Sequence, residues 1–141
     1  MKKTVLLAAL VMMLTTVVAG IAYAADIDGT PSRDRLVGTQ HGDDINGWGA
    51  PDYIDGLASG DELHGGYGAD TVYGRNGEDT VYGDKGRDKL YGNGLDDRVY
   101  AEDDTSDYVN CGNGDEDWAI VDGFDTVVNC EIVNEESIEE E

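Results

Sequence analysis

Aspartate recurs every ninth residue through the middle of this sequence, and carboxylates at such a regular spacing could bind metal ions or act as acid–base pairs. The series is Asp34, Asp43, Asp52, Asp61, Asp70, Asp79, Asp88 and Asp97. Carboxylate oxygens are hard ligands that suit Ca²⁺ or Mg²⁺ better than zinc or copper. Two carboxylates could also serve a glycosidase as acid and nucleophile. Which chemistry applies depends on how the chain positions the series.

The aspartates are the sixth residues of a nine-residue unit that repeats eight times without a gap over residues 29–100. Every unit begins with glycine: Gly29, Gly38, Gly47, Gly56, Gly65, Gly74, Gly83 and Gly92. The eighth residue is always aliphatic: Leu36, Ile45, Ile54, Leu63, Val72, Val81, Leu90 and Val99. Three positions held through eight units predict a repeat protein in which each unit forms the same small element.

Each unit is long enough for one tight turn and one very short strand. We expect the first glycine to adopt a positive φ and open the turn, and residues seven to nine to form the strand with residue eight pointing inward. Turn and strand together carry the chain halfway round a flattened coil, so two units, about 18 residues, complete one coil. The sequence therefore predicts an all-β fold, a parallel β-solenoid whose coils stack about 4.8 Å apart.

Stacking with this period places alternate aspartates above one another on two edges. One column holds Asp34, Asp52, Asp70 and Asp88, and the other holds Asp43, Asp61, Asp79 and Asp97. Carboxylates stacked this closely repel one another, and a ladder of protonated aspartates is not expected near neutral pH. A divalent cation between successive coils removes the repulsion. Carboxylate and carbonyl ligands favour several Ca²⁺ ions over Mg²⁺, which prefers a small, strict octahedron and retains its water.

The unit resembles the RTX, or hemolysin-type, calcium-binding nonapeptide G-G-x-G-x-D-x-U-x. Residues 65–73, GGYGADTVY, match it at every specified position. The resemblance implies a parallel β-roll in which calcium lies between turns, bound by the position-six aspartates and by backbone carbonyls. By this resemblance the carbonyl ligands belong to Gly65, Tyr67, Ala69, Gly74, Asn76, Glu78, Gly83, Lys85 and Arg87.

Departures from the motif separate stronger from weaker candidate sites. The fourth-position glycine is present only at Gly68, Gly77 and Gly86, and Pro51 restricts the backbone just before Asp52. The candidate carboxylate ligands are Asp61, Asp70, Asp79, Asp88 and Asp97, with Asp52 added at the weaker end of the series. The weaker positions, where metal-poor N-terminal turns are expected, are Asp34, Asp43 and Asp52.

Residues 1–24 have the pattern of a secretory signal peptide. Lys2 and Lys3 precede an apolar run over residues 5–21, and residues 22–24, AYA, place small side chains at the positions that a signal peptidase inspects. We expect cleavage after Ala24, secretion of the chain and a lead-in at residues 25–28; an uncleaved anchor helix is the alternative. Loss of the two lysines changes the net charge from −22 to −24.

After the eighth unit the period loosens, and residues 101–134 are expected to form degenerate repeats and an irregular C-terminal cap. The separation of Cys111 and Cys130 is close to one coil, so they should lie on adjacent layers. An exported chain favours a disulfide between them, with two free thiols as the alternative. Residues 135–141, EESIEEE, predict a solvated, disordered acidic tail.

Tyrosine occupies the ninth position of four units, at Tyr73, Tyr82, Tyr91 and Tyr100. One coil separates Tyr73 from Tyr91 and Tyr82 from Tyr100, so two stacked pairs are expected. We favour a ladder that stabilises the sheets. An aromatic strip that binds a glycan or a protein is the alternative.

Charge and motif content exclude several classes of function. Acidic residues outnumber basic ones 31 to 9, which argues against nucleic acid and, after signal cleavage, against contact with an anionic membrane. H-E-x-x-H and G-x-S-x-G are both absent, and we expect no enzymatic activity. The sequence thus predicts a secreted calcium-binding protein that folds on binding calcium. The alternatives are a calcium-rigidified adhesion or matrix module with a glycan or protein partner, and an accessory fragment of a secreted enzyme or toxin.

Overall fold

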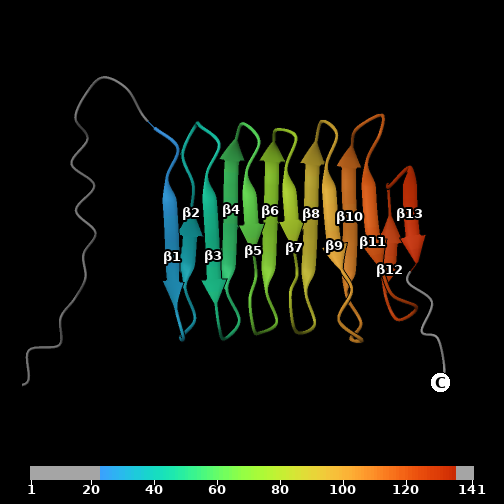
Figure 1. Cartoon of the computed structure of the whole chain (residues 1–141), viewed down its shortest axis with the longest axis horizontal. Coiled ribbons are helices and arrows are strands. Elements are labelled where there is room, and N and C mark those ends of the chain that lie inside the picture. Colours follow the sequence, from blue (N-terminus) through green and yellow to red (C-terminus); the bar gives the residue numbers. More distant parts are fainter. Residues whose placement is uncertain (1–22, 136–141) are drawn as a thin grey trace, which may run out of the picture.

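The computed structural model describes residues 23–135, which form strands and turns without any helix. The strands run side by side, in sequence order along the long axis of the molecule (Figure 1). Their bounds are β1 (Asp26–Thr30), β2 (Arg35–Val37), β3 (Asp44–Trp48), β4 (Tyr53–Ala58), β5 (Glu62–His64), β6 (Thr71–Asn76), β7 (Thr80–Tyr82), β8 (Lys89–Gly94), β9 (Arg98–Ala101), β10 (Tyr108–Asn113), β11 (Trp118–Val121), β12 (Thr126–Val128) and β13 (Ile132–Glu135). The predicted signal peptide at residues 1–24 and the predicted acidic tail at residues 135–141 lie almost entirely outside the described residues.

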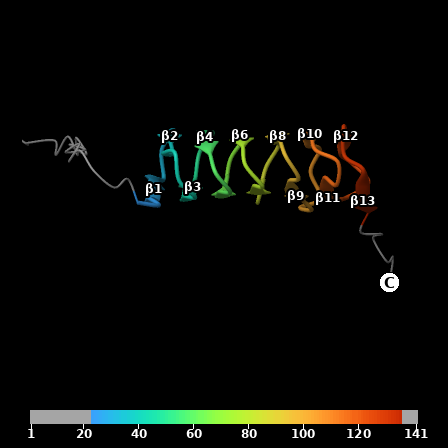
Figure 2. The ribbon, with the colours of Figure 1, turned by 90° about the horizontal axis from the view of Figure 1, so that it is seen from above.

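Odd- and even-numbered strands form two parallel sheets. Sheet A has seven strands in the order β1-β3-β5-β7-β9-β11-β13, and sheet B has six in the order β12-β10-β8-β6-β4-β2. Seen from above, the chain passes back and forth between two rows of strands (Figure 2). Neighbours in a sheet are one coil apart: Glu62 pairs with Thr80 and Thr71 pairs with Lys89, a step of two nonapeptide units in each case. The predicted all-β solenoid with two units per coil is confirmed.

A single layer of aliphatic side chains fills the space between the two sheets. Seven position-eight residues are at most 1% exposed: Ile45, Ile54, Leu63, Val72, Val81, Leu90 and Val99. Their neighbours along each strand face outward, because side chains alternate along a strand. Each buried side chain contributes about 2 kcal/mol. With one such side chain in every unit, the core of the regular coils is thin.

The C-terminal residues continue both sheets with irregular spacing. Lys89 pairs with Tyr108 and Arg98 pairs with Trp118, and both steps are longer than two nonapeptide units. The last step in sheet A, from Trp118 to Ile132, is shorter than two units. The expected irregular end of the solenoid is thus confirmed, and its strands extend the sheets instead of folding back over them.

The C-terminal coils also have a thicker core than the regular ones. Three buried residues stand where the regular units have their first glycine: Ala101, Cys111 and Val121. They pack beside the position-eight residues of the same coils, so each of these coils has two inward apolar side chains where a regular unit has one. A disulfide joins Cys111 to Cys130, as the spacing predicts.

The N-terminal lead-in is part of the solenoid. β1 begins within residues 25–28 and pairs with β3, which places Ile27 beside Ile45. Ile27 is partly buried against the core and marks the N-terminal end of its inward column among the described residues. Within residues 23–135 no helix is long and apolar enough to span a membrane.

Aromatic rings form ladders on the outer faces of both sheets. Tyr73 stacks on Tyr91 and Tyr82 stacks on Tyr100, each with ring centroids 4.7 Å apart, so both predicted pairs are confirmed. His64 extends the second ladder, with its ring 4.3 Å from that of Tyr82. The rings lie face to face along the long axis and cover one another's faces. This geometry supports the packing interpretation over a strip on which a sugar could stack.

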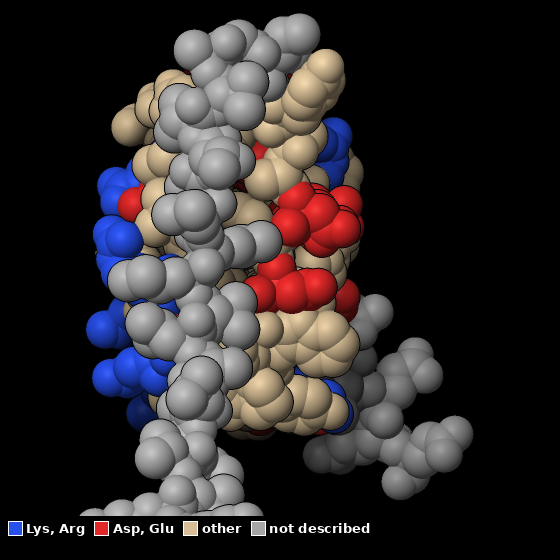
Figure 3. Space-filling model, turned by 90° about the vertical axis from the view of Figure 1, so that its left-hand side faces the viewer, with Lys and Arg blue, Asp and Glu red and all other residues tan. Residues whose placement is uncertain are grey.

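The two outer faces of the solenoid differ in charge. Sheet A exposes Asp26, Asp44 and Glu62 on successive strands, whereas sheet B exposes Arg35 and Lys89. Viewed from the end at which β1 lies, Lys and Arg lie mainly on one side of the molecule and Asp and Glu on the other (Figure 3). Part of the acidic charge is therefore on an open surface, separate from the aspartate columns at the edges.

Candidate metal sites between the coils

The position-six aspartates lie in two columns at the two edges of the solenoid, where the turns connect the sheets. From Asp43 onward, each accepts a hydrogen bond at Oδ1 from the backbone N–H one coil earlier. The Asp52 N–H donates to Asp70 at 2.7 Å, and the Asp70 N–H donates to Asp88 at 2.8 Å. In the other column the Asp61 N–H donates to Asp79 at 2.8 Å. One carboxylate oxygen of each aspartate thus ties successive coils together.

Both columns continue beyond the eight regular units. The Asp88 N–H donates to Asp107 at 2.8 Å, the Asp107 N–H to Asp125 at 2.9 Å, and the Asp97 N–H to Asp117 at 2.7 Å. Asp107, Asp117 and Asp125 are not among the ligands predicted from the sequence, because the spacing there departs from the nonapeptide period. Each is followed at the second position after it by an apolar side chain, and this Asp-x-apolar pattern is the signal that could have found them.

The second carboxylate oxygen, Oδ2, lacks a hydrogen-bond partner in the middle of the described chain, unlike Oδ1. Six Oδ2 atoms are buried without a hydrogen-bond partner among residues 23–135, those of Asp52, Asp61, Asp70, Asp79, Asp88 and Asp97. A buried ionised oxygen without a donor or a cation is strongly unfavourable. The six belong to the aspartates predicted as carboxylate ligands, and Asp52, ranked with the weaker positions, has the same environment as the other five. Each of these aspartates therefore has one buried oxygen that a cation could satisfy.

Burial also changes the protonation of these carboxyl groups. It raises the pKa of Asp61 to about 7 and those of Asp70 and Asp79 to about 6. It raises the pKa of Asp88 and of Asp97 to about 8. The backbone N–H donated to each carboxylate opposes burial, with a smaller effect. Without a cation, the pKa values of Asp88 and Asp97 therefore leave these two carboxyl groups mostly protonated near neutral pH.

The first glycine of every regular unit except the one that begins at Gly83 leaves room for two oxygens from successive coils. A Cβ at Gly65 would lie 2.7 Å from the Gly83 carbonyl oxygen and 2.8 Å from Oδ2 of Asp70. A Cβ at Gly74 would likewise meet Oδ2 of Asp79 and, at 2.8 Å, the carbonyl of the glycine one coil on. A carboxylate and a carbonyl oxygen thus converge on the space that a side chain would fill. This oxygen-only donor set fits Ca²⁺.

The predicted carbonyl ligands fall into three positions in the turns. Gly65, Gly74 and Gly83 are the position-one residues at these glycine spaces. Tyr67 and Lys85 form an isolated parallel bridge between adjacent turns, and Asn76 ends β6. Ala69, Glu78 and Arg87 directly precede the aspartates. No group of three or more His, Cys, Asp or Glu side chains within residues 23–135 could hold a metal ion, so a cation here needs backbone carbonyls in addition to the carboxylates.

The first two regular units satisfy their aspartates internally. The Thr30 N–H donates to Oδ2 of Asp34 at 2.6 Å, and the Thr30 hydroxyl donates to the same atom at 2.9 Å. Thr39 provides the same two donors to Asp43, its N–H to Oδ2 at 2.5 Å and its hydroxyl to Oδ1 at 3.0 Å. A threonine at position two therefore provides the donors that the later units lack, a physical reason to expect metal-poor turns at this end.

Left-handed backbone occurs at the second residue of the unit and not at the first. φ is positive at position two in six consecutive units, at Trp48, Leu57, Gly66, Arg75, Asp84 and Asn93. None of the position-one glycines in residues 29–100 has a positive φ, so that prediction is wrong. These glycines are required by the close approach of the next coil. The six left-handed units are also the six with an unpartnered aspartate oxygen.

Comparison with known proteins agrees with the motif. The family profile described as RTX calcium-binding nonapeptide repeat (4 copies) matches residues 55–90 and 73–105. These residues include five of the six aspartates with an unpartnered buried oxygen. No curated protein and no solved structure matches the chain. Residues 55–105, which contain all of these aspartates except Asp52, therefore match the RTX calcium-binding nonapeptide repeat.

Proposed function

We propose that this protein is a secreted calcium-binding protein whose solenoid holds Ca²⁺ ions between successive coils and folds when they bind. The observation that carries the proposal is the set of six buried carboxylate oxygens without a partner, from Asp52 to Asp97. Regular units place a glycine carbonyl beside such an oxygen, as at Gly65. Bound calcium would supply the positive charge that these oxygens lack.

The aspartate, the first glycine and the position-eight residue of a unit have different roles in the proposed binding. One oxygen of each aspartate accepts the N–H of the preceding coil and fixes the side chain in the turn, as Asp70 does for Asp52. The other oxygen is left for the cation. The position-one glycine, for example Gly65, excludes a Cβ from the space in which carboxylate and carbonyl meet. The position-eight residue of the same unit anchors the turn to the core.

Folding on calcium binding follows from the weakness of the other stabilising forces. A regular unit buries one aliphatic side chain, and the net charge of the chain is −22. A thin core opposed by this much like charge leaves the metal-free fold marginal. Binding free energy then becomes folding free energy. We propose no catalytic role for the acidic residues.

Secretion is proposed from the signal-peptide pattern of residues 1–24. The disulfide between Cys111 and Cys130 supports it, because such bonds persist in oxidising compartments. Extracellular calcium sites typically have dissociation constants of about 0.1–1 mM. A chain that meets such calcium only after crossing the membrane would fold after translocation.

Far-UV circular dichroism of the purified chain, titrated with calcium and then with a chelator, tests the proposal. We expect a disordered spectrum in chelator, a β-rich spectrum at millimolar calcium and a much weaker response to magnesium. The variant Asp70→Asn should raise the midpoint calcium concentration about tenfold. Asp34→Asn is the matched control, since Asp34 has the same place in its unit but is satisfied by Thr30. A spectrum unchanged by calcium and chelator would contradict the proposal.

A further inference from the structure

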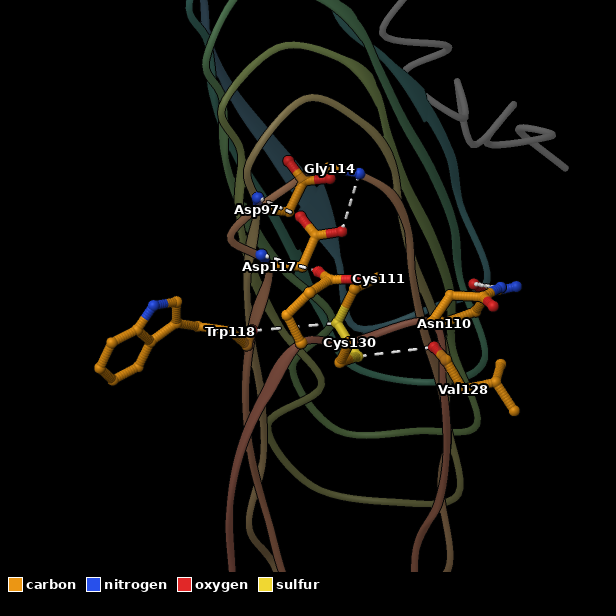
Figure 4. Close-up of a disulfide and its surroundings, with 10 residues drawn as sticks. Asp97, Asn110, Cys111, Gly114, Asp117, Trp118, Val128 and Cys130 are labelled. Atoms are coloured by element: carbon orange, nitrogen blue, oxygen red, sulfur yellow. Dashed lines mark hydrogen bonds between the residues drawn. A yellow bond between two sulfur atoms is a disulfide. The ribbon is translucent and has the colours of Figure 1, made fainter.

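The disulfide lies next to the last unpartnered aspartate of one column. Asp97 is fully buried, and its Oδ2 has no hydrogen-bond partner among residues 23–135. Figure 4 shows Asp97 above Asp117, with the bond between Cys111 and Cys130 below them. Asp117 accepts the Asp97 N–H at 2.7 Å with one oxygen and the Gly114 N–H at 3.1 Å with the other. Asp97 is therefore the last aspartate of its column with an oxygen left for a cation.

At this position a cysteine carbonyl takes the place of a glycine carbonyl. A Cβ at Gly92 would have as its two nearest neighbours Oδ2 of Asp97 and the carbonyl oxygen of Cys111. The corresponding neighbours at Gly65 are the carboxylate of its own unit and the carbonyl of the position-one glycine one coil on. The same pair of oxygens is therefore built beside Asp97, with Cys111 as the carbonyl donor.

Cys111 differs from the glycine it replaces because it is covalently fixed. Its sulfur is bonded to Cys130 and lies 4.0 Å from the Trp118 carbonyl oxygen. The next residue, Gly112, has φ +118° and donates its N–H to the Asn129 carbonyl at 3.2 Å. The disulfide and the hydrogen bond of the Gly112 N–H thus both restrain the position of the Cys111 carbonyl.

We propose that the Cys111 carbonyl oxygen is a ligand of the cation position beside Asp97, and that the disulfide makes this one position sensitive to reduction. The inference rests on the proposed binding of calcium. A thiol or phosphine reductant breaks the S–S bond, the two sulfurs gain two electrons and two protons, and the reductant is oxidised. Cys111 is then free to move its carbonyl away from Asp97. Loss of the support of a ligand weakens metal binding about tenfold or more.

The other column provides an internal control at the same depth in the solenoid. Asp88 is also buried with an unpartnered Oδ2. A Cβ at Gly83 would lie 2.9 Å from that oxygen, but its next neighbour is Cδ1 of Leu90 at 3.1 Å and not a carbonyl. Ala101 stands at position one of the next coil, and neither cysteine takes part. Reduction should leave calcium binding at Asp88 unchanged.

Calorimetric titration with calcium chloride, before and after treatment with a phosphine reductant, tests this inference on three forms of the full chain. In the wild type, reduction should weaken the binding of one ion about tenfold and leave the others unchanged. Asp97→Asn should lack that ion and give the same titration in both redox states. Asp88→Asn should lack a different ion and keep the effect of reduction.

A variant without a cross-link separates loss of the disulfide from any effect of the reductant. Cys111→Gly combined with Cys130→Ala restores the glycine of the regular units and should show the weaker affinity with and without reductant. Identical titrations of the oxidised and reduced wild type would overturn the inference, as would redox sensitivity that persists in Asp97→Asn. A reduced chain without β structure at saturating calcium would also overturn it, because the disulfide would then support the whole fold. An oxidised wild type that binds no calcium would instead contradict the proposed function.

Discussion

Non-glycine residues adopt a left-handed backbone conformation at position four of three units as well as at position two. Ala50, Ser59 and Leu95 have φ between +68° and +74° at position four, where three other units have glycine. An L-residue in this conformation costs about 1–2 kcal/mol, because its Cβ approaches the following carbonyl oxygen. These residues therefore subtract from the stability of a fold whose core is already thin. They show that the coil geometry is imposed by neighbouring coils and not by local preference.

Leu95 offers the clearest test of this strain, because its side chain is 60% exposed and contributes little to packing. Leu95→Gly should raise the free energy of unfolding by about 1 kcal/mol, since relief of the strain exceeds the entropy that glycine adds to the unfolded chain. Leu95→Ala removes the same exposed surface but keeps the Cβ, and should leave stability nearly unchanged. Urea unfolding at saturating calcium measures both variants. Equal stabilities of the two would show that the left-handed turn carries no strain.

The parts of the strands that are set by residues within a single unit were predictable from the sequence. Positions seven to nine form strands throughout, and Leu63 or Val81 points inward as its spacing predicts. The extension of β4, β6 and β8 through position three was not predictable, because it depends on pairing such as Leu57 with Arg75 one coil on. The wrong assignment of φ to the first glycine has the same cause. A glycine required for a left-handed turn and a glycine required for the close approach of another coil look the same in the sequence. Only the contacts with the neighbouring coil distinguish them.

The role now assigned to the first glycine of each unit predicts a steric effect of substitution. Gly65→Ala places a Cβ 2.7 Å from the Gly83 carbonyl oxygen and 2.8 Å from Oδ2 of Asp70. It should destabilise the calcium-bound fold by about 1–3 kcal/mol, the usual cost of overpacking, and weaken calcium binding. Gly123→Ala is the control, because nothing lies within 4 Å of its Cβ and its φ is not left-handed. Thermal unfolding at saturating calcium compares them; an equal loss in both would refute the steric role.

The whole molecule has three kinds of coil along its long axis. At the N-terminal end Thr30 and Thr39 donate to the aspartates, in the middle the second aspartate oxygens are buried without a partner among the described residues, and at the C-terminal end Ala101 and Val121 add apolar contacts beside the disulfide. The sequence identified the middle as the metal-binding part because the motif is regular there. It could not show the threonine donors at one end or the added apolar contacts at the other, because those depend on which donors and side chains the turns bring together.

The middle coils make the stability of the metal-free fold depend on pH in an unusual direction. Burial raises the pKa of Asp61 to about 7 and that of Asp97 to about 8, far above the value of about 4 in an unfolded chain. The folded state therefore binds more protons than the unfolded state. The stability linked to these protons is fully present below about pH 4 and is lost as the pH rises through the folded-state pKa values, from about 6 to about 8. In chelator, β structure measured by circular dichroism should increase between about pH 8 and about pH 5.

Calcium should reverse this dependence, because the ion and the proton compete for the same carboxylate oxygens. Between about pH 8 and about pH 6, the calcium concentration needed for half-maximal folding should rise roughly tenfold. General charge repulsion is a competing explanation for the gain of structure in acid, and ~1 M sodium chloride at about pH 8 separates the two, because it screens charges without protonating them. If salt alone restored the β signal in chelator, the buried columns would not be the source of the pH dependence. If acid restored it and salt did not, protons would be standing in for calcium at Asp61, Asp88 and Asp97, whose second oxygens are buried without a partner.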